Sequence, residues 1–357
     1  MLAVRAWCRS AKRSTPAVDV WVVVATVLLV WRGRSKIRDS GDGRTPGATS
    51  GSWGTACHAH QVTPACDQVL AIDIGGTKLA AGVVDRAGRI VSSAQAPTVG
   101  ADAEDLFEVL IGVVTEGIAG SELDSMAACG VGSGGPMSAG GVRISPLNIG
   151  QWRDFPLRDR LAERLGMDVW VDNDAKALAL AEGWQGAARG SGNYLAMVVS
   201  TGVGGGVVVD GRLLDGHAGN AGHIGHMIVE PGGRLCGCGA RGCLEAEASG
   251  TAIRAFTGAH PAEASEEVRV RTGEMVGRAV ASVVNLLDLR LACVAGSVAL
   301  GYGDVFFAAA QAELDRSCRI GHARGARIVP GGLGSSGPLV GAGAVAWRKL
   351  GVEVGVR

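Results

Sequence analysis

Apolar and polar positions alternate in short blocks from residue 67 onward, and these blocks predict an α/β chain. Residues 69–74 are apolar except for Asp73 and are rich in β-branched side chains, which is typical of a buried strand. A Gly-Gly turn and strands at 79–85 and 89–94 follow, so the opening is not a dinucleotide-binding unit, in which a helix follows the glycines. Apolar side chains at helical spacing then predict a helix over 102–118.

The same order of elements occurs a second time. Strands are predicted at 127–131 and 169–171, the second followed by a helix to about residue 183. A strand at 194–200, a glycine turn at 201–206 and a strand at 207–209 then repeat the strand, turn and strand of the opening. Such a repeat indicates two related lobes with a ligand-binding cleft between them. The remaining predicted elements are a strand at 291–294 and helices at 268–287, 303–316 and 339–350.

Residues 1–66 differ from the rest, because they carry nine Lys or Arg against three Asp. Their apolar run at 20–31 is too short to span a bilayer, which takes about 20 residues. Basic residues follow the run and no small-residue cleavage site appears, which does not suit a signal peptide. We expect an unstructured extension or an artefact of an upstream start, with a peripheral anchor or a small folded element as alternatives. No pair of amphipathic helices is visible in these residues, so we do not expect a DNA-binding helix-turn-helix there.

Composition excludes two broad classes of protein. Hydrophobic residues make up 47% of the 357 residues and charged residues 19%, which excludes a mostly disordered chain. The 34 Lys and Arg balance the 34 Asp and Glu, so no global charge attracts nucleic acid. The 57 glycines show no Gly-X-Y period and are expected to serve turns and close backbone approaches, such as those that cradle phosphates.

Two glycine turns are candidates for phosphate binding. In the first, Asp73 ends a strand and Gly-Gly-Thr-Lys follows at 75–78, offering backbone N–H groups, a hydroxyl and a cation. Asp73 suits Mg²⁺ held through water. The second turn begins at Thr201. A plain hairpin turn is the alternative for each, but a nucleotide between two lobes needs contacts from both.

Asn173 and Asp174 lie at the end of a predicted strand, where the next helix begins. A carboxylate there can accept the proton of an attacking hydroxyl, the usual protein contribution to phosphoryl transfer beyond positioning and charge neutralisation. The alternative is structural, because Asp is a favoured residue at a helix N-cap. The residues alone leave both roles open for Asp174.

The most specific motif combines His226 with Cys236, Cys238 and Cys243. Three thiolates and one imidazole within 18 residues match a closed tetrahedral zinc site, in which the ion is structural. The alternative, a disulfide with a spare thiol, is disfavoured because no secretory signal is apparent. The other six cysteines are scattered and are expected to be ordinary thiols.

These motifs together resemble the ROK family of sugar kinases, which includes bacterial glucokinases, and of sugar-responsive repressors. The matching motifs are Asp-x-Gly-Gly-Thr-Lys, Asn-Asp, Thr-Gly-x-Gly-Gly, Gly-x-x-Gly-His and Cys-x-Cys-Gly-x-x-Gly-Cys-Leu-Glu, between about 69 and 350. The resemblance implies an α/β, actin-like or hexokinase-like (ribonuclease H-type) fold of two lobes about a cleft, with a small zinc module. The implied domains are an extension at 1–66, a small lobe at 67–186 plus 337–357, and a large lobe at 187–336 with the zinc module at 226–243.

The resemblance also implies roles for single residues. Asp174 would be the general base, and one ring nitrogen of His226 would bind zinc while the other faces the sugar. The implied sugar-binding residues are Gly134, Gly135, Asn148, Asn173, Asp174, His223, His226 and Glu245. The residues implied to bind ATP and Mg²⁺ are Asp73, Gly75, Gly76, Thr77, Lys78, Thr201, Gly202, Gly204 and Gly296. The implied zinc ligands are His226, Cys236, Cys238 and Cys243.

Three positions depart from the family pattern. His223 stands where the family has Glu, and a neutral imidazole offers one donor and one acceptor where the carboxylate accepts from sugar hydroxyls. Ser297 replaces a glycine near the nucleotide. Lys176 stands where the family often has Asn, and we expect it to face solvent on its helix.

The leading hypothesis is an ATP-dependent hexose kinase, glucokinase-like, that phosphorylates the sugar 6-hydroxyl with Asp174 as base. Alternatives are a kinase for another sugar, such as an N-acetylhexosamine or allose, and a non-catalytic sugar-binding regulator. A third alternative is a zinc module that binds nucleic acid. It is disfavoured because the only basic residues in the module are Arg234 and Arg241. Thiolate zinc and ATP imply a reducing cytoplasm, and the family implies a homodimer. From the balanced charge and the short apolar run we expect no nucleic-acid partner and no membrane association of the folded part.

Overall fold

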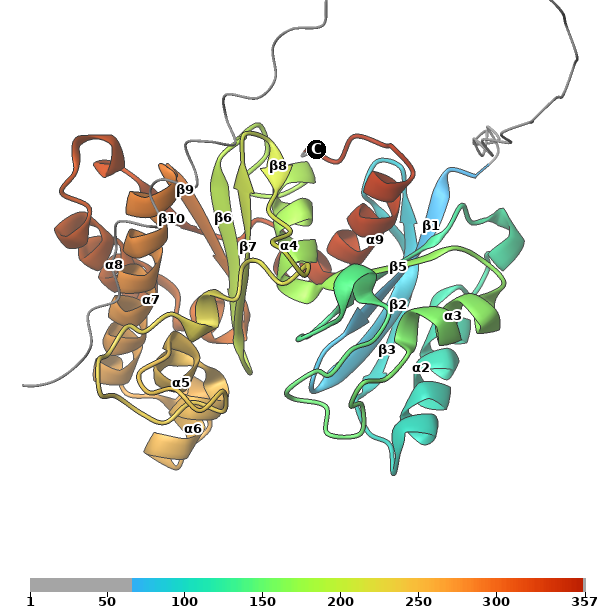
Figure 1. Ribbon diagram of the computed structural model, residues 1–357, viewed down its shortest axis with the longest axis horizontal. Coiled ribbons are helices and arrows are strands. Elements are labelled where there is room, and N and C mark those ends of the chain that lie inside the picture. The colour runs from blue at the N-terminus through green and yellow to red at the C-terminus, as the bar shows by residue number, and fades with distance from the viewer. Residues whose placement is uncertain (1–65, 356–357) are drawn as a thin grey trace, which may run out of the picture. The chain divides into compact units, whose positions relative to one another are not determined.

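The computed structural model describes residues 66–355, which form two β-sheets with helices between and outside them (Figure 1). These residues belong to one compact unit, Gln61–Arg357. The predictions for residues 1–65, including the apolar run at 20–31, lie outside the described residues. Within 66–355, no helix is both long enough and apolar enough to cross a bilayer.

The first sheet has the strand order β3-β2-β1-β4-β5. β1 pairs antiparallel with β2 and parallel with β4, and β4 pairs parallel with β5. The carboxyl ends of β1, β4 and β5 therefore meet at one edge of the sheet, where Ser133 is opposite both Ile74 and Asn173. The strands are β1 (Gln68–Ile74), β2 (Lys78–Asp85), β3 (Ile90–Pro97), β4 (Cys129–Ser133) and β5 (Val169–Asn173).

The second sheet repeats this topology with the order β10-β9-β6-β7-β8. β6 pairs antiparallel with β7 and parallel with β9, as β1 does with β2 and β4. The internal repeat predicted from the sequence is thus confirmed. The strands are β6 (Tyr194–Val199), β7 (Val203–Val209), β8 (Arg212–Leu213), β9 (Leu291–Ala295) and β10 (Arg327–Pro330).

Two helices, α4 (Asp174–Trp184) and α9 (Gly337–Lys349), pack on each other between the sheets (Figure 1). Their small side chains form one apolar core with Val69 and Ala71 of the first sheet and Tyr194 and Ala196 of the second. Helices α2 (Ala103–Gly117) and α3 (Leu157–Leu165) cover the outer face of the first sheet, and α7 (Glu266–Leu287) and α8 (Ser297–Ser317) cover that of the second. Helices α5 (Leu244–Ala248) and α6 (Gly250–Thr257) complete the second half.

We call β1–β5 with α2, α3 and α9 the first lobe, and β6–β10 with α5–α8 the second lobe. The two copies of the repeat lie in different lobes, as expected. The predicted lobe boundaries at 186 and 337 stay a prediction. The predicted helix at 102–118 is present as α2, and the Asp102 carboxylate caps it by accepting from the N–H groups of Glu104 and Asp105 at 2.9 Å.

The glycine turn predicted at 201–206 is wrong in its length, because β7 begins at Val203. The turn contains only residues 200–202, with the Ser200 N–H bonded to the Gly202 carbonyl at 2.9 Å. The later glycines lie in the strand because α4 packs directly on it. A Cβ on Gly206 would lie 2.7 Å from the Ala179 Cβ and 2.9 Å from the Ala175 carbonyl oxygen.

The helix predicted at 303–316 begins earlier, at Ser297. Gly303 has a φ of 58° and interrupts the helical dihedrals, so the periodicity is broken there. Val298, Ala299 and Tyr302, N-terminal to the break, are buried in the second-lobe core, and this packing retains the first turns.

The approach of α9 to the first sheet gives a test of the packing. A Cβ on Gly130 of β4 would lie 2.0 Å from the Ala342 carbonyl oxygen. Gly130→Ala is therefore expected to lower the free energy of unfolding by about 3 kcal/mol in urea titrations. Gly112→Ala is the control, because nothing lies within 4 Å of its Cβ position in α2, and it should add about 0.5–1 kcal/mol. Equal stabilities of the two variants would contradict this packing.

Candidate active site

Two carboxylates lie at the edge of the first sheet where β1, β4 and β5 end. Gly132 separates them, since a Cβ on it would lie 3.7 Å from Asp73 Oδ1 and 3.6 Å from the Asp174 Cα. Burial, and secondarily the charge of Asp174, raises the pKa of Asp73 to about 7, although Lys78 acts in the opposite direction. Burial also raises the pKa of Asp174, against the hydrogen bonds that it accepts. A cation or a transferable proton would stabilise this pair.

The start of α4 shows which residue caps the helix. Asn173 is the N-cap, and its side-chain oxygen accepts from the N–H groups of Ala175 at 3.1 Å and Lys176 at 3.3 Å. Asp174 is the first helical residue, where its Oδ1 accepts from the Ala175 N–H at 2.8 Å. Since Asn173 caps the helix, capping does not account for Asp174.

The first glycine turn joins β1 to β2 as a hairpin, with the Gly75 N–H bonded to the Lys78 carbonyl at 3.0 Å. Thr77 and Lys78 are exposed. Asn148 lies against this turn, because a Cβ on Gly76 would be 2.4 Å from Asn148 Nδ2. The Asn148 amide oxygen also lies 3.5 Å from the Cβ position of Gly134, so Asn148 stands between the hairpin and the loop after β4.

The second turn lies beside Glu245 in the first turn of α5. Glu245 Oε2 accepts from the Val203 N–H at 3.1 Å and lies 3.0 Å from the Cβ position of Gly202. Next to it, Ser200 Oγ is 2.9 Å from Ser297 Oγ, and Gly296 is the N-cap of α8 with a φ of 101°. The turn with Thr201 therefore neighbours Gly296 and Ser297, which were expected near the nucleotide. Gly204, in contrast, is a strand residue whose Cβ position is 3.0 Å from the Ala175 Cβ.

His223 meets residues of the first lobe. Its ring Cε1 lies 3.4 Å from the Cβ position of Gly135, and Asn173 Nδ2 lies 3.7 Å from the same position. The rings of His223 and His226 have centroids 6.0 Å apart. Burial, and then the neighbouring His226, lowers the pKa of His223, against the effect of Glu245, so the imidazole is neutral at pH 7.

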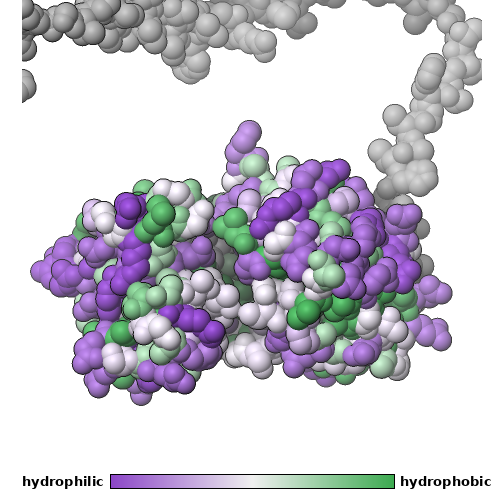
Figure 2. Space-filling model, turned by 90° about the horizontal axis from the view of Figure 1, so that it is seen from below, coloured by the Kyte–Doolittle hydropathy of each residue, from purple (hydrophilic) through white to green (hydrophobic). Residues whose placement is uncertain are grey.

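A contact between the lobes involves a residue that the motifs did not indicate. Asn220 donates from Nδ2 to the Met137 carbonyl at 3.0 Å and accepts at Oδ1 from the Met137 N–H at 3.3 Å. Met137 lies in the loop after β4, and Asn220 lies three residues before His223. Seen from below, the surface between the two lobes is hollowed and bordered by pale residues of intermediate hydropathy (Figure 2).

The expectation that Lys176 faces solvent is wrong. Its side chain is only 2% exposed, and Nζ lies 2.8 Å from Asp172 Oδ1 and 2.8 Å from Asp215 Oδ1. α4 carries almost no polar face, because it is enclosed between the two sheets. A lysine in a helix gives no sign of this in the sequence, because Asp215 and Gly219, which help to enclose it, lie 39 and 43 residues away.

The four predicted metal ligands come together at the surface of the second lobe. All four donor atoms lie within 4.8 Å of one another. The Cys236 Sγ is 3.7 Å from His226 Nδ1, and the Cys238 and Cys243 Sγ atoms are 3.7 Å apart. Donors about 2.3 Å from a tetrahedral zinc ion are separated by about 3.8 Å, whereas a disulfide needs about 2.05 Å. The donor set fits zinc and does not fit a disulfide.

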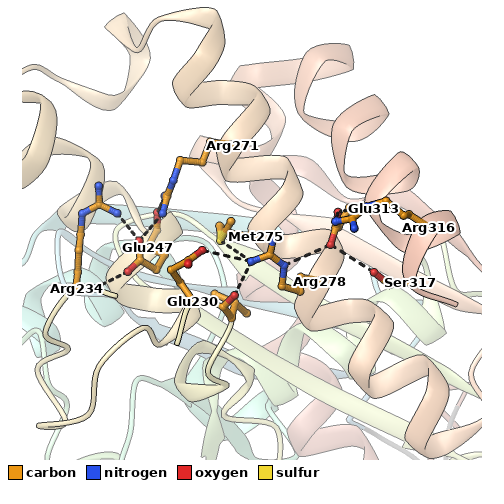
Figure 3. Close-up of polar contacts among 10 residues, drawn as sticks. Glu230, Arg234, Glu247, Arg271, Met275, Arg278, Glu313, Arg316 and Ser317 are labelled. Atoms are coloured by element: carbon orange, nitrogen blue, oxygen red, sulfur yellow. Dashed lines mark hydrogen bonds and ion pairs between the residues drawn. The ribbon is translucent and has the colours of Figure 1, made fainter. Parts of the chain in front are cut away.

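Two buried carboxylates, Glu247 and Glu313, help to hold the residues that precede the cysteine cluster against α7 and α8 (Figure 3). Glu247 is an ion-pair partner of both Arg234 and Arg271 and accepts from the Arg234 N–H at 2.7 Å. Arg278 donates to the Val229 carbonyl at 2.7 Å and lies 3.3 Å from Glu313. The residues before Cys236 are therefore fixed to the lobe independently of a metal ion.

The raised pKa of Asp73 predicts a dependence of stability on pH. The folded protein binds this proton more tightly than the unfolded chain, whose carboxyl has a pKa of 3.8. The stabilisation is complete below about pH 4 and is lost as the pH rises toward 7, with a total of at most about 4 kcal/mol. Asp73→Asn should flatten this decline in urea unfolding with EDTA present.

The control for Asp73 is Asp67→Asn, which removes an exposed carboxyl just before β1. It should leave the decline unchanged. Asp174 contributes a remaining slope in both variants, because its pKa is raised in the same direction. Identical pH dependence in Asp73→Asn and the wild type would show that Asp73 does not titrate in this window.

Comparison with known proteins identifies the family. The profile described as the ROK family matches residues 69–349. The chain is 41% identical to a glucokinase of Thermotoga maritima over 192 residues, which are 53% of this chain and 59% of that protein. It is 36% identical to an N-acetylmannosamine kinase of Yersinia pseudotuberculosis over 249 residues, 66% of this chain and 84% of that protein.

The fold also matches a solved structure, a ROK family glucokinase from Streptomyces griseus in complex with glucose and AMPPNP. The TM-score is 0.70 at 30% identity, and the match covers 79% of this chain and 99% of that one. The two sheets with their shared topology, and the motifs from 69 to 349, confirm the hexokinase-like fold. The chain belongs to the ROK family.

Proposed function

We propose that the protein is an ATP-dependent sugar kinase that transfers the γ-phosphoryl group of ATP to a hydroxyl of a hexose or an N-acetylhexosamine. If the substrate is a hexose, as in a glucokinase, the acceptor is the 6-hydroxyl. The observation that carries the proposal is the half-buried Asp174 side chain, placed beside Asp73 at the sheet edge and not used as a helix cap. The named relatives support it, since one is a glucokinase and another an N-acetylmannosamine kinase.

Asp174 acts as the general base in this proposal. Its raised pKa makes the carboxylate a stronger proton acceptor than an exposed Asp, and the proton of the attacking hydroxyl passes to it as the O–P bond forms. The capping bonds of Asn173 fix the first turn of α4, and the bond from the Ala175 N–H orients the carboxylate. This orientation keeps the base in position before the substrate arrives.

The nucleotide would lie between the two glycine turns. The hairpin at 75–78 offers N–H groups, the Thr77 hydroxyl and the Lys78 ammonium, and the turn at Thr201 and Gly202 offers the contacts from the second lobe. Gly296, beside that turn, would border the adenosine. When bound, Mg²⁺ neutralises phosphate charge, and Asp73 is the carboxylate that would hold it through water. Gly204 would act through strand packing, since its Cβ position faces α4.

The sugar would contact residues of both lobes. Asn148, Asn173 and the loop at Gly134 and Gly135 come from the first lobe side, and His223, His226 and Glu245 from the second. A neutral His223 presents one donor and one acceptor, so it cannot receive two sugar hydroxyls as a carboxylate does. This favours a substituent that accepts one hydrogen bond, and an N-acetyl group is such a substituent.

Zinc would fix one of these sugar contacts. His226 turns Nδ1 toward the cysteine sulfurs, which leaves Nε2 for a second partner. A metal-bound imidazole has a fixed tautomer and ring orientation, so Nε2–H becomes a defined donor. The ion is thereby structural, and the transfer chemistry does not pass through it.

The proposal is tested by ADP release with Mg²⁺-ATP and a panel of glucose, mannose, allose, fructose, N-acetylglucosamine and N-acetylmannosamine. Asp174→Asn should lower kcat by about a thousandfold, because proton acceptance is lost while the shape is kept. Sugar affinity by calorimetry should stay within about twofold. The control is Asp168→Asn, an exposed residue that precedes the opposite end of β5.

A variant Asp174→Asn that keeps most of its activity would exclude this residue as the base. Sugar binding without ADP formation in the wild type would instead support a sugar-binding regulator. A folded, zinc-loaded wild type that neither binds nor phosphorylates any sugar of the panel would contradict the proposed substrate class.

The zinc site predicts one zinc ion per chain by elemental analysis of protein purified without chelator. Cys238→Ala should lose the ion and weaken sugar binding by about tenfold, because the metal no longer fixes the orientation of the His226 ring toward the sugar. Cys318→Ala removes a buried thiol outside the cluster and should retain the zinc. A zinc-free wild type with full activity would overturn the structural role of the ion.

A further inference from the structure

Lys176 is the most fully enclosed cation of the described residues, and three oxygen atoms surround its Nζ. Nζ is 2.8 Å from Asp172 Oδ1, 2.8 Å from Asp215 Oδ1 and 3.2 Å from the Gly219 carbonyl oxygen. An ammonium group has three donors and no acceptor, so this set satisfies it. Burial of such a group is costly unless it is paired, which makes the arrangement sensitive to loss of any partner.

The three acceptors come from two segments that are distant in sequence. Asp172 belongs to β5 and accepts from the Asn173 N–H at 2.8 Å, directly before the proposed base. Asp215 and Gly219 belong to residues 214–223, which we call the sugar segment because it ends at His223. Lys176 therefore joins the strand end that carries Asp174 to the segment that carries His223.

The sugar segment has few other attachments. Its backbone closes on itself through the Ala221 N–H and the Asp215 carbonyl at 3.0 Å. Asn220 ties its middle to Met137 of the first lobe. At its end, a Cβ on Gly222 would lie 2.1 Å from the Gly205 carbonyl, so the segment rests directly on β7. Of these attachments, the one at Lys176 is ionic.

The neighbouring charges indicate that the ion pair between Lys176 and Asp215 persists at neutral pH. Partial burial raises the pKa of Asp215, but the hydrogen bond and charge of Lys176 outweigh it and lower the pKa below its usual value, with Arg348 and Lys349 acting in the same direction. Asp215 is therefore ionised at neutral pH, at which we expect the kinase reaction to proceed. Its side chain is 57% exposed, so its removal need not disturb the core.

We propose that Lys176 is a positioning residue, which sets the sugar segment against the end of β5 so that His223 and Asp174 face one substrate. The inference rests on the proposed function. Lys176 touches neither substrate nor nucleotide in this account, and it acts only through Asp172, Asp215 and the Gly219 carbonyl.

The first test is Asp215→Asn in the full chain, because this variant frees the segment and leaves the Lys176–Asp172 pair in place. We expect the sugar KM to rise about fivefold to tenfold, as the segment must be ordered on binding. The KM for ATP and kcat should change by less than about twofold, because the phosphate turns and Asp174 keep their contacts. Asp210→Asn is the matched control, an exposed carboxylate five residues away.

The second measurement is amide hydrogen exchange over residues 214–223 in the same proteins. Asp215→Asn and Lys176→Met should exchange faster there than Asp210→Asn and the wild type. In Lys176→Met the bare Asp172 carboxylate next to Asp174 should also lower kcat and move the pH–rate profile to higher pH. If Lys176→Met fails to fold, Asp215→Asn carries the test.

An unchanged sugar KM in Asp215→Asn would overturn the positioning role, whether or not exchange of the segment becomes faster. Equal exchange in Asp215→Asn and Asp210→Asn would overturn it as well. A wild type that binds sugar without forming ADP would contradict the kinase proposal alone. In that case sugar affinities from calorimetry replace KM and decide the role of Lys176 in the same way.

Discussion

The close approach of two helices to two sheets is the constraint on which the rest of the structure depends. α4 and α9 fill the space between the sheets, and they fit because glycines and alanines bring backbone against backbone. A Cβ on Gly341 of α9 would lie 2.6 Å from the Ala177 carbonyl oxygen of α4, and the shortest such distances at Gly130 and Gly206 are 2.0 and 2.7 Å. Since α4 begins with Asp174, this packing also fixes the depth of the proposed base at the sheet edge.

Charge is placed around this apolar centre at three points, each where a strand or helix ends. Asp73 and Asp174 share the edge of the first sheet, where burial raises both of their pKa values. Lys176, in the first turn of α4, joins that edge to the segment before His223. The cysteine cluster holds His226, and Glu247 with its two arginines braces the cluster against α7 (Figure 3). The proposed sugar contacts are thus fixed from both lobes by interactions outside the transfer chemistry.

Local patterns predicted much of this, and tertiary contacts decided the remainder. The strand, glycine turn and strand at 69–85 and the helix capped by Asp102 follow from short-range periodicity and capping. The His and Cys spacing predicted a cluster that the structure brings together. The glycines at 204 and 206 could not be separated from a turn, because they are required by the contact with α4, which is distant in sequence. Lys176 and Asn220 could not be interpreted, because Asp215 and Met137, which they contact, lie 39 and 83 residues away.

The central claim is that a sugar hydroxyl attacks the γ-phosphorus of ATP at the edge where Asp73 and Asp174 meet. Phosphorus NMR of the wild-type protein with Mg²⁺-ATP and the sugar that binds most tightly tests it directly. The account predicts that the γ-phosphate signal is replaced by the signals of ADP and of a phosphomonoester coupled to sugar protons. Release of inorganic phosphate alone, or unchanged ATP beside bound sugar, would contradict it.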